Sequence, residues 1–82
     1  MAEKNERVLS LSTTFSSNLR SRRKAMKLTQ EALAERVPMD ARHYRRIEGG
    51  TALPSVALGY LLAQRLDTTV EALFEEDNQA KS

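Results

Sequence analysis

The segment Pro38-Met39-Asp40 constrains this fold most, because it leaves only three residues between two helical patterns. Proline has no N–H to donate and disfavours the α conformation in the preceding residue, so the first helix is expected to end at Val37. Asp40 is a typical N-cap and lets the second helix begin at once. The chain is therefore expected to hold two helices joined by a turn of three or four residues.

The capping residues define these two helices. Thr29 is expected to cap "QEALAERV", with Gln30 and Glu31 in the first turn, where polar and acidic groups suit unpaired N–H donors. The second helix, "ARHYRRIE", is expected to end at the two glycines that follow it.

A longer helix is expected to precede them, over about residues 14–26. Phe15, Leu19 and Met26 lie along one side of it, and we expect Met26 and Met39 to fill the core. Residues 1–13 are polar and lack strong periodicity, so we expect them to form an N-terminal tail.

Two further helices are expected after the glycines. Ser55 follows a proline and opens "VALGYLLAQRL", which is apolar on most of its circumference and is expected to be buried on several sides, with Tyr60 in the core. Thr68 and Glu71 form a capping box for a short fifth helix. The residues of that helix expected to point inward are Val70, Leu73 and Phe74. The expected fold is all-α, a compact five-helix domain over residues 14–76 with a polar tail at 77–82.

The helix "ARHYRRIE" carries three arginines on one side. At about 100° per residue, with Arg42 at 0°, Arg46 lies near 40° and Arg45 near 300°. Tyr44 and Ile47 lie near 200° and 140°, so we expect them to face the core and hold the arginines outward. The arginines form either a solvated charged face or a surface for an anion. The planar guanidinium can donate two hydrogen bonds to guanine O6 and N7.

The charges of the chain are unevenly distributed. Residues 1–50 hold eleven Lys and Arg and six Asp and Glu, a net charge of 11 − 6 = +5, whereas residues 51–82 hold two and five, a net charge of 2 − 5 = −3. A basic half and an acidic half favour an anionic partner that is bound on one side only.

Several classes of function are disfavoured. The chain has no cysteine and a single histidine, His43, so we expect no metal site and no cofactor. No apolar run approaches the roughly 20 residues of a membrane span, and the start lacks a signal peptide, so we expect a cytoplasmic protein. We expect no enzyme, because the sequence shows no paired carboxylates on a shared face, no nucleophile beside a base and no glycine-rich phosphate loop.

Residues 19–74 resemble the Cro/repressor-type helix-turn-helix domains, also called the Xre family, which have a lambda-repressor-like fold. The resemblance rests on residue types at fixed spacings along most of the chain. These are Thr29-Gln30-Glu31, Leu33-Ala34, Ile47-Glu48 with Gly50, then Pro54, Leu66 and Leu73.

The resemblance implies a sequence-specific transcriptional regulator that binds double-stranded DNA, with the helix after Asp40 in the major groove. By register, the base-reading positions are Ala41, Arg42, Arg45 and Arg46. The resemblance also implies an ion pair between Arg23 and Glu48. The residues expected to contact the DNA backbone are Thr29, Gln30, His43 and Thr51.

Three residues depart from the family pattern. Gly49 replaces the usual asparagine, which removes only a local side-chain hydrogen bond. Pro38 stands where the turn usually has a glycine, and because proline is not expected to adopt a positive φ, we expect the turn to close differently. Ala41 leaves at most an apolar contact with a thymine methyl at the first reading position.

A single domain of this kind reads too few base pairs to select one genomic site, so we expect a homodimer on an inverted repeat. Its contact is expected on the outer side of the fourth helix and on the fifth, at Leu62, Arg65, Val70 and Phe74. The alternative is an antitoxin or accessory module that holds a protein partner and binds DNA secondarily. The apolar fourth helix and the acidic end "EALFEEDNQ" are compatible with both readings.

Overall fold

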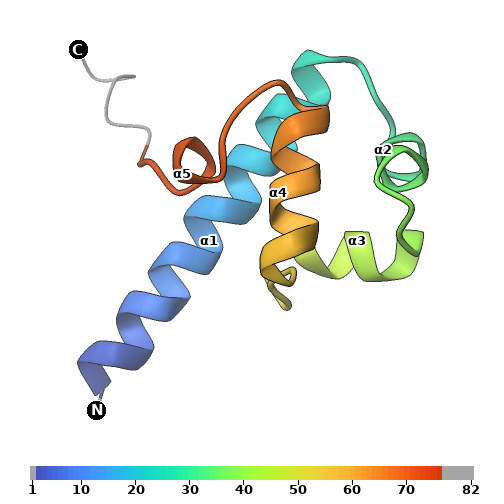
Figure 1. The fold of residues 1–82 in the computed structure, drawn as a ribbon. Helices are drawn as coiled ribbons and strands as arrows, with labels where there is room; N and C mark the ends of the chain where they lie inside the picture. Colours follow the sequence, from blue (N-terminus) through green and yellow to red (C-terminus); the bar gives the residue numbers. More distant parts are fainter. Residues whose placement is uncertain (1, 77–82) are drawn as a thin grey trace.

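The computed structural model describes residues 2–76, and over that range the chain forms five helices and no strand (Figure 1). The predicted all-α fold is confirmed. The helices are α1 (Ala2–Ala25), α2 (Gln30–Arg36), α3 (Ala41–Glu48), α4 (Val56–Arg65) and α5 (Val70–Leu73).

The helix α1 begins at Ala2 and not near residue 14, so most of the predicted N-terminal tail is helical. No glycine or proline occurs in residues 2–25, and the helical hydrogen bonds can continue back from the buried Phe15. Residues 6–10 are exposed, and this part of α1 projects away from the other helices (Figure 1). A helix without a core to face needs no apolar stripe, which is why periodicity missed it. The predicted tail at 77–82 lies outside the described residues.

The helices α2 and α3 begin where their caps predict. The Thr29 hydroxyl oxygen accepts a hydrogen bond from the Ala32 N–H at 3.0 Å, and the Asp40 carboxylate accepts one from the His43 N–H at 3.2 Å. Each cap satisfies one of the donors that a helix start leaves without a partner in the helix.

The turn between α2 and α3 differs from the prediction. Pro38 has a φ of 26°, so the turn keeps a left-handed residue where a glycine is usual, and the expected different closure is wrong. The Met39 N–H donates to the Ala34 carbonyl oxygen at 3.0 Å and closes the turn. This hydrogen bond requires residue 38 to turn back over the helix end, a geometry that the ring of proline disfavours.

The hydrophobic core draws side chains from all five helices. Met39 packs against it as predicted, but Met26 is 42% exposed. Met26 lies one residue beyond the end of α1, where the chain already turns away from the buried side of the helix. The buried apolar residues are Phe15, Leu19, Leu33, Ala34, Val37, Tyr44, Ile47, Leu62, Ala63, Leu66 and Leu73.

The helix α4 is buried along one side only, in contrast to the prediction. Leu62 and Ala63 lie in the core, whereas Val56 is 90% exposed and Tyr60 is 55% exposed. The hydroxyl of Tyr60 accepts a hydrogen bond from the Gln64 amide at 3.0 Å. In so small a bundle, the other helices cover only one side of α4, and its remaining apolar residues stay at the surface.

The helix α5 is capped by Thr69 and not by the predicted box of Thr68 and Glu71. The Thr69 hydroxyl oxygen accepts from the Ala72 N–H at 3.1 Å. The Thr68 N–H instead donates to the Ala63 carbonyl oxygen at 2.9 Å, as part of the turn that ends α4. The inward-facing residues follow the prediction: Leu73 is fully buried, and Val70 and Phe74 pack half-buried against the core.

Candidate nucleic-acid interface

The outer side of α3 carries the three predicted arginines. Tyr44 and Ile47 are 0% exposed, and Glu48 is also buried, so the opposite side of the helix is anchored in the core. The side chains of Arg42, Arg45 and Arg46 are exposed. We call these three residues the arginine ridge. It is a cationic surface on the side of α3 that faces away from the core.

The other predicted contact residues surround this ridge. Ala41 and His43 are half-buried at its two edges, and Gln30 is half-buried at the start of α2. Thr29 and Thr51 are exposed. The Thr51 hydroxyl donates to the Arg46 carbonyl oxygen at 3.2 Å, at the C-terminal end of α3.

An ion pair that the sequence analysis missed joins α2 to the ridge. The Arg45 Nη1 lies 3.4 Å from Glu31 Oε2, and the two side chains are 49% and 65% exposed. An exposed pair of this kind contributes at most about 1 kcal/mol. Arg45 can therefore exchange Glu31 for an external anion at little cost.

The ion pair between Arg23 and Glu48, which the family resemblance implies, is present and buried. Arg23 Nε donates to Glu48 Oε2 at 2.7 Å, and Arg23 Nη2 donates to Glu48 Oε1 at 2.9 Å. Arg23 Nη1 donates to the Leu28 carbonyl oxygen at 2.7 Å. The two-pronged contact fixes the end of α3, and with it the ridge, against α1.

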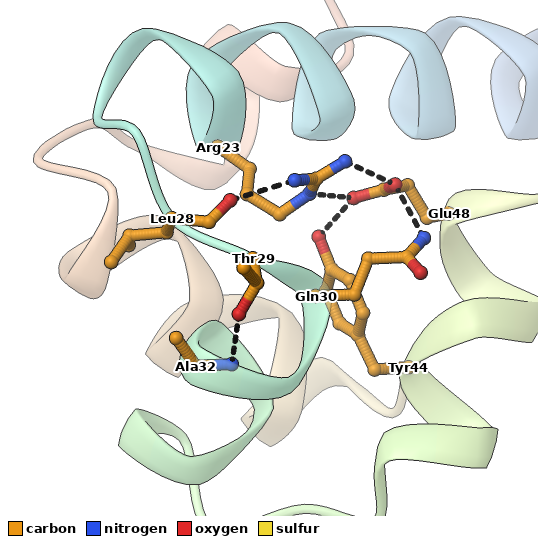
Figure 2. A network of polar contacts seen from close by, with 7 residues as sticks. All are labelled: Arg23, Leu28, Thr29, Gln30, Ala32, Tyr44 and Glu48. Carbon is orange, nitrogen blue, oxygen red and sulfur yellow. Dashed lines mark hydrogen bonds and ion pairs between the residues drawn. The ribbon is translucent and has the colours of Figure 1, made fainter.

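Two further residues complete this cluster, as Figure 2 shows. The Tyr44 hydroxyl donates to Glu48 Oε2, and the Gln30 amide donates to Glu48 Oε1 at 2.8 Å. One carboxylate thus receives hydrogen bonds from α1, α2 and α3. The sequence analysis missed both partners, although Tyr44 and Glu48 are four residues apart on one helix and so lie on one side.

The cluster shifts the pKa values of its members. Burial opposes ionisation of Glu48, but the hydrogen bonds from Arg23, Tyr44 and Gln30 outweigh it and hold the pKa of Glu48 below its usual 4.5. The hydrogen bond to Glu48 raises the pKa of Arg23. Burial, helped by the hydrogen bond to Glu48, raises the pKa of Tyr44 far above 10. At neutral pH the cluster therefore contains one carboxylate, one guanidinium and a neutral phenol.

The residues predicted for a dimer contact are not all at the surface. Leu62 is 0% exposed and belongs to the core, so its assignment to the outer side of α4 is wrong. Arg65 is exposed, and its Nε donates to the Arg36 carbonyl oxygen at 3.0 Å. Phe74 packs its ring 4.9 Å from that of Phe15. The large apolar side chains of α4 that are exposed are instead Val56 and Tyr60.

Two other kinds of site are absent from residues 2–76. No group of three or more potential metal ligands occurs in this part of the chain. Within the same residues, no helix combines the length and the apolar character that a membrane crossing requires.

Comparison with known proteins identifies relatives of this chain. The family model HTH_3, described as helix-turn-helix, matches residues 19–73. The chain is similar to the restriction-modification controller protein C.AhdI from Aeromonas hydrophila, with 32% sequence identity and a TM-score of 0.72. The similarity covers 77% of this chain and 96% of that chain. No curated protein matches.

Two longer structures share the fold. The hydroxypropylphosphonic acid epoxidase from S. wedmorenis is 25% identical with a TM-score of 0.73, over 80% of this chain but only 35% of the enzyme. An HTH_3 family transcriptional regulator from Vibrio cholerae is 24% identical with a TM-score of 0.74, over 88% of this chain and 40% of that one. The chain thus spans a little over a third of either protein, and the likeness to the epoxidase concerns its helix-turn-helix part.

Proposed function

The chain belongs to the helix-turn-helix family of DNA-binding transcriptional regulators, and on this premise we propose that it recognises an inverted-repeat operator as a homodimer. In this proposal α3 lies in the major groove. Arg42, Arg45 and Arg46 read base edges, with Ala41 against the bases at the helix start. Thr29, Gln30, His43 and Thr51 contact the DNA backbone.

The observation that carries the proposal is the arginine ridge itself. Three guanidinium groups project from a helix whose opposite side is fully buried, so they cannot be drawn into the core. A convex helix with long donors fits the width of the major groove, where guanine offers two acceptors side by side. The cluster around Glu48 fixes the angle of this helix to α1 and α2, which helps a base-reading surface keep its geometry.

The similarity to the C.AhdI controller supports a regulatory role for a chain of this size. That protein is matched over 96% of its chain. A protein described as a restriction-modification controller thus resembles this chain over nearly its whole length, which supports the same kind of role for this chain.

We place the dimer contact on the outer side of α4 and on α5. Tyr60 and Val70 line a hollow of about 410 Å³ between these helices, together with Thr69 and Glu71. Leu62 is not part of this contact because it is buried. Val70 and Phe74 are half-buried, and we place them at the edge of the contact. In a two-fold symmetric dimer both protomers use the same surface patch. One charged substitution in this patch therefore places two like charges in the interface, and their repulsion weakens the dimer.

The test starts from an operator selected out of random duplex DNA. We expect an enriched inverted repeat whose half-site centres lie about 10 base pairs, one helical turn, apart. The Tyr60→Glu variant is expected to remain folded, to sediment as a monomer and to lose affinity for the full repeat at least tenfold. Its affinity for an isolated half-site is expected to stay within twofold of the parent chain.

The matched control is Leu9→Glu, which charges an exposed apolar residue on the projecting part of α1 and is expected to change neither assembly nor binding. Enrichment of a single half-site by a monomeric chain would contradict the dimer. A monomer that enriches no sequence would favour the protein-interaction module instead.

A further inference from the structure

The three arginines of the ridge differ in their surroundings. Arg45 has an acidic neighbour, because its Nη1 donates a hydrogen bond to Oε2 of Glu31 at 3.4 Å. Within residues 2–76, Arg42 and Arg46 take part in no ion pair. All three arginines are exposed on the same side of α3, so the difference between them comes from α2, which carries Glu31 in its first turn.

The contact with Glu31 leaves most of the Arg45 guanidinium available. A guanidinium has five N–H groups in a fixed plane, and Glu31 accepts a hydrogen bond from only one of its nitrogens, Nη1. Nε and Nη2 form another edge of the group, and this edge can donate two parallel hydrogen bonds to guanine O6 and N7. Arg45 can therefore hold Glu31 and read a base at the same time.

Arg23 divides its guanidinium between two partners in this way (Figure 2). Its Nε and Nη2 donate to the two oxygens of Glu48, while its Nη1 donates to the Leu28 carbonyl oxygen. The contact at Nη1 helps to fix the plane of the group for the two-pronged contact at the other edge. Glu31 can do the same for Arg45, because it accepts from the same nitrogen.

The other carboxylate close to Arg45 cannot replace Glu31. Glu48 and Arg45 line one hollow at the end of α3, but both oxygens of Glu48 already accept hydrogen bonds from the cluster around it. Within residues 2–76, Arg45 takes part in no ion pair besides that with Glu31. Loss of Glu31 would therefore leave the half-exposed side chain of Arg45 free to turn, and a side chain that is free to turn loses more conformational entropy when it binds a base.

We propose that Glu31 is a positioning residue that makes Arg45 selective for a base over the DNA backbone. The assignment rests on the proposed function, in which Arg45 reads a base edge. Base contacts carry sequence information, whereas phosphate contacts carry none. The carboxylate favours the operator over random DNA in two ways, because it orients the donors of Arg45 for guanine and competes with phosphates for the same cation.

The experiment measures dissociation constants of the whole chain by fluorescence anisotropy, on the selected operator, on each single base-pair variant of it and on random duplex DNA. At about 50 mM salt, Glu31→Ala is expected to bind random duplex about two- to fivefold more tightly, the range that an exposed ion pair allows. It is also expected to lose discrimination by about threefold or more at the base pair that Arg45→Ala affects, and at no other base pair. The gain on random duplex should shrink at about 200 mM salt, because salt screens exposed charges.

The matched control is Glu35→Ala, which removes an exposed carboxylate from the same helix. This control is expected to leave discrimination unchanged at every base pair. In a chain that already carries Arg45→Ala, the substitution Glu31→Ala should have no more effect than Glu35→Ala, because the side chain that Glu31 positions is gone.

A Glu31→Ala chain that keeps full discrimination at the base pair read by Arg45 would overturn the proposal. Equal effects of Glu31→Ala with and without Arg45 would also overturn it, since they would show a general effect of charge. An Arg45→Ala chain that keeps discrimination at every base pair would contradict base reading by Arg45 and the role of Glu31 together, so the two failures are distinguishable.

Discussion

Glu48 accepts hydrogen bonds from residues on three helices at once, and its environment decides what its loss would do. Replacing it with glutamine keeps the size of the side chain but leaves the guanidinium of Arg23 without its counter-charge. Stranding one member of a buried pair costs roughly 3–5 kcal/mol. We expect the Glu48→Gln variant to lose stability of that order at pH 7, measured by urea unfolding.

The pH dependence of this loss has a definite sign. Because the pKa of Glu48 in the folded chain lies below its usual value of 4.5, ionised Glu48 contributes stability above that value. This contribution disappears as the pH falls through the folded-state pKa. The difference in unfolding free energy between the parent chain and Glu48→Gln should therefore be largest at neutral pH and shrink below about pH 4.5.

The control for Glu48→Gln is Glu35→Gln, which removes an exposed carboxylate and is expected to change the unfolding free energy by less than about 0.5 kcal/mol. A Glu48→Gln protein as stable as the parent at pH 7, or a difference that does not change with pH, would contradict the role of the cluster.

The candidate site was predictable from the sequence where it depends on one helix. The angular positions of Arg42, Arg45 and Arg46 relative to Tyr44 follow from helix geometry alone, and the structure agrees. The contacts of Gln30 with Glu48 and of Glu31 with Arg45 were not predictable in that way. They join residues of α2 and α3 and depend on the angle at which the two helices meet.

At the scale of the helix, the first four helices end alike. In each helix, the residue two positions after the C-cap donates its N–H to the carbonyl oxygen of the third-last residue of the helix. The residue directly after the C-cap has a positive φ. These left-handed residues are Lys27 at 60°, Pro38 at 26°, Gly50 at 84° and Asp67 at 61°. This is the Schellman arrangement.

Pro38 completes this arrangement less well than the other three residues. Lys27, Gly50 and Asp67 each donate their own N–H to a carbonyl oxygen of the preceding helix, at 2.9, 3.1 and 3.0 Å. Proline has no N–H, and its ring favours a φ near −65°. The end of α2 therefore lacks one hydrogen bond and holds a backbone angle that its own residue resists.

We expect the Pro38→Gly variant to be more stable than the parent chain. Relief of an unfavourable backbone angle is worth about 1–3 kcal/mol, while the greater freedom of unfolded glycine costs about 0.4–1 kcal/mol. The net gain in the free energy of unfolding, measured in urea, should lie between about 0 and 2.6 kcal/mol. Pro38→Ala restores the N–H but keeps a Cβ at positive φ, so it should gain less. A glycine variant less stable than the parent would show that the turn does not strain Pro38.

The sequence predicted helix boundaries well where a capping residue marks them. Thr29, Asp40 and Ser55 each start a helix by accepting a hydrogen bond from a backbone N–H, which is a local interaction. The start of α1 was missed because it has neither a marked boundary nor an apolar stripe. At α5, two adjacent threonines could serve as cap, and the choice of Thr69 depends on how α4 ends.

At the scale of the whole molecule, the cations concentrate where the fold brings α1 and α3 together. The +5 charge of residues 1–50 includes the arginine ridge and the basic residues of α1 between Arg20 and Lys24, whereas α5 and the described residues after it are acidic. The proposed DNA contact and the proposed dimer contact thus involve different helices. Charge can attract DNA on one side without opposing association on the other.

The central claim is that the arginine ridge reads bases, and the most direct measurement is the binding free energy of Arg42→Ala and Arg46→Ala on the selected operator and on each single base-pair variant of it. We predict that each substitution abolishes discrimination at one base pair per half-site, a loss of about 1–3 kcal/mol per contact, and leaves the other positions unchanged. Arg36→Ala, which removes an exposed arginine at the end of α2, should leave discrimination intact at every position. If both ridge variants lost the same binding free energy on the operator as on random DNA, base reading by α3 would be contradicted.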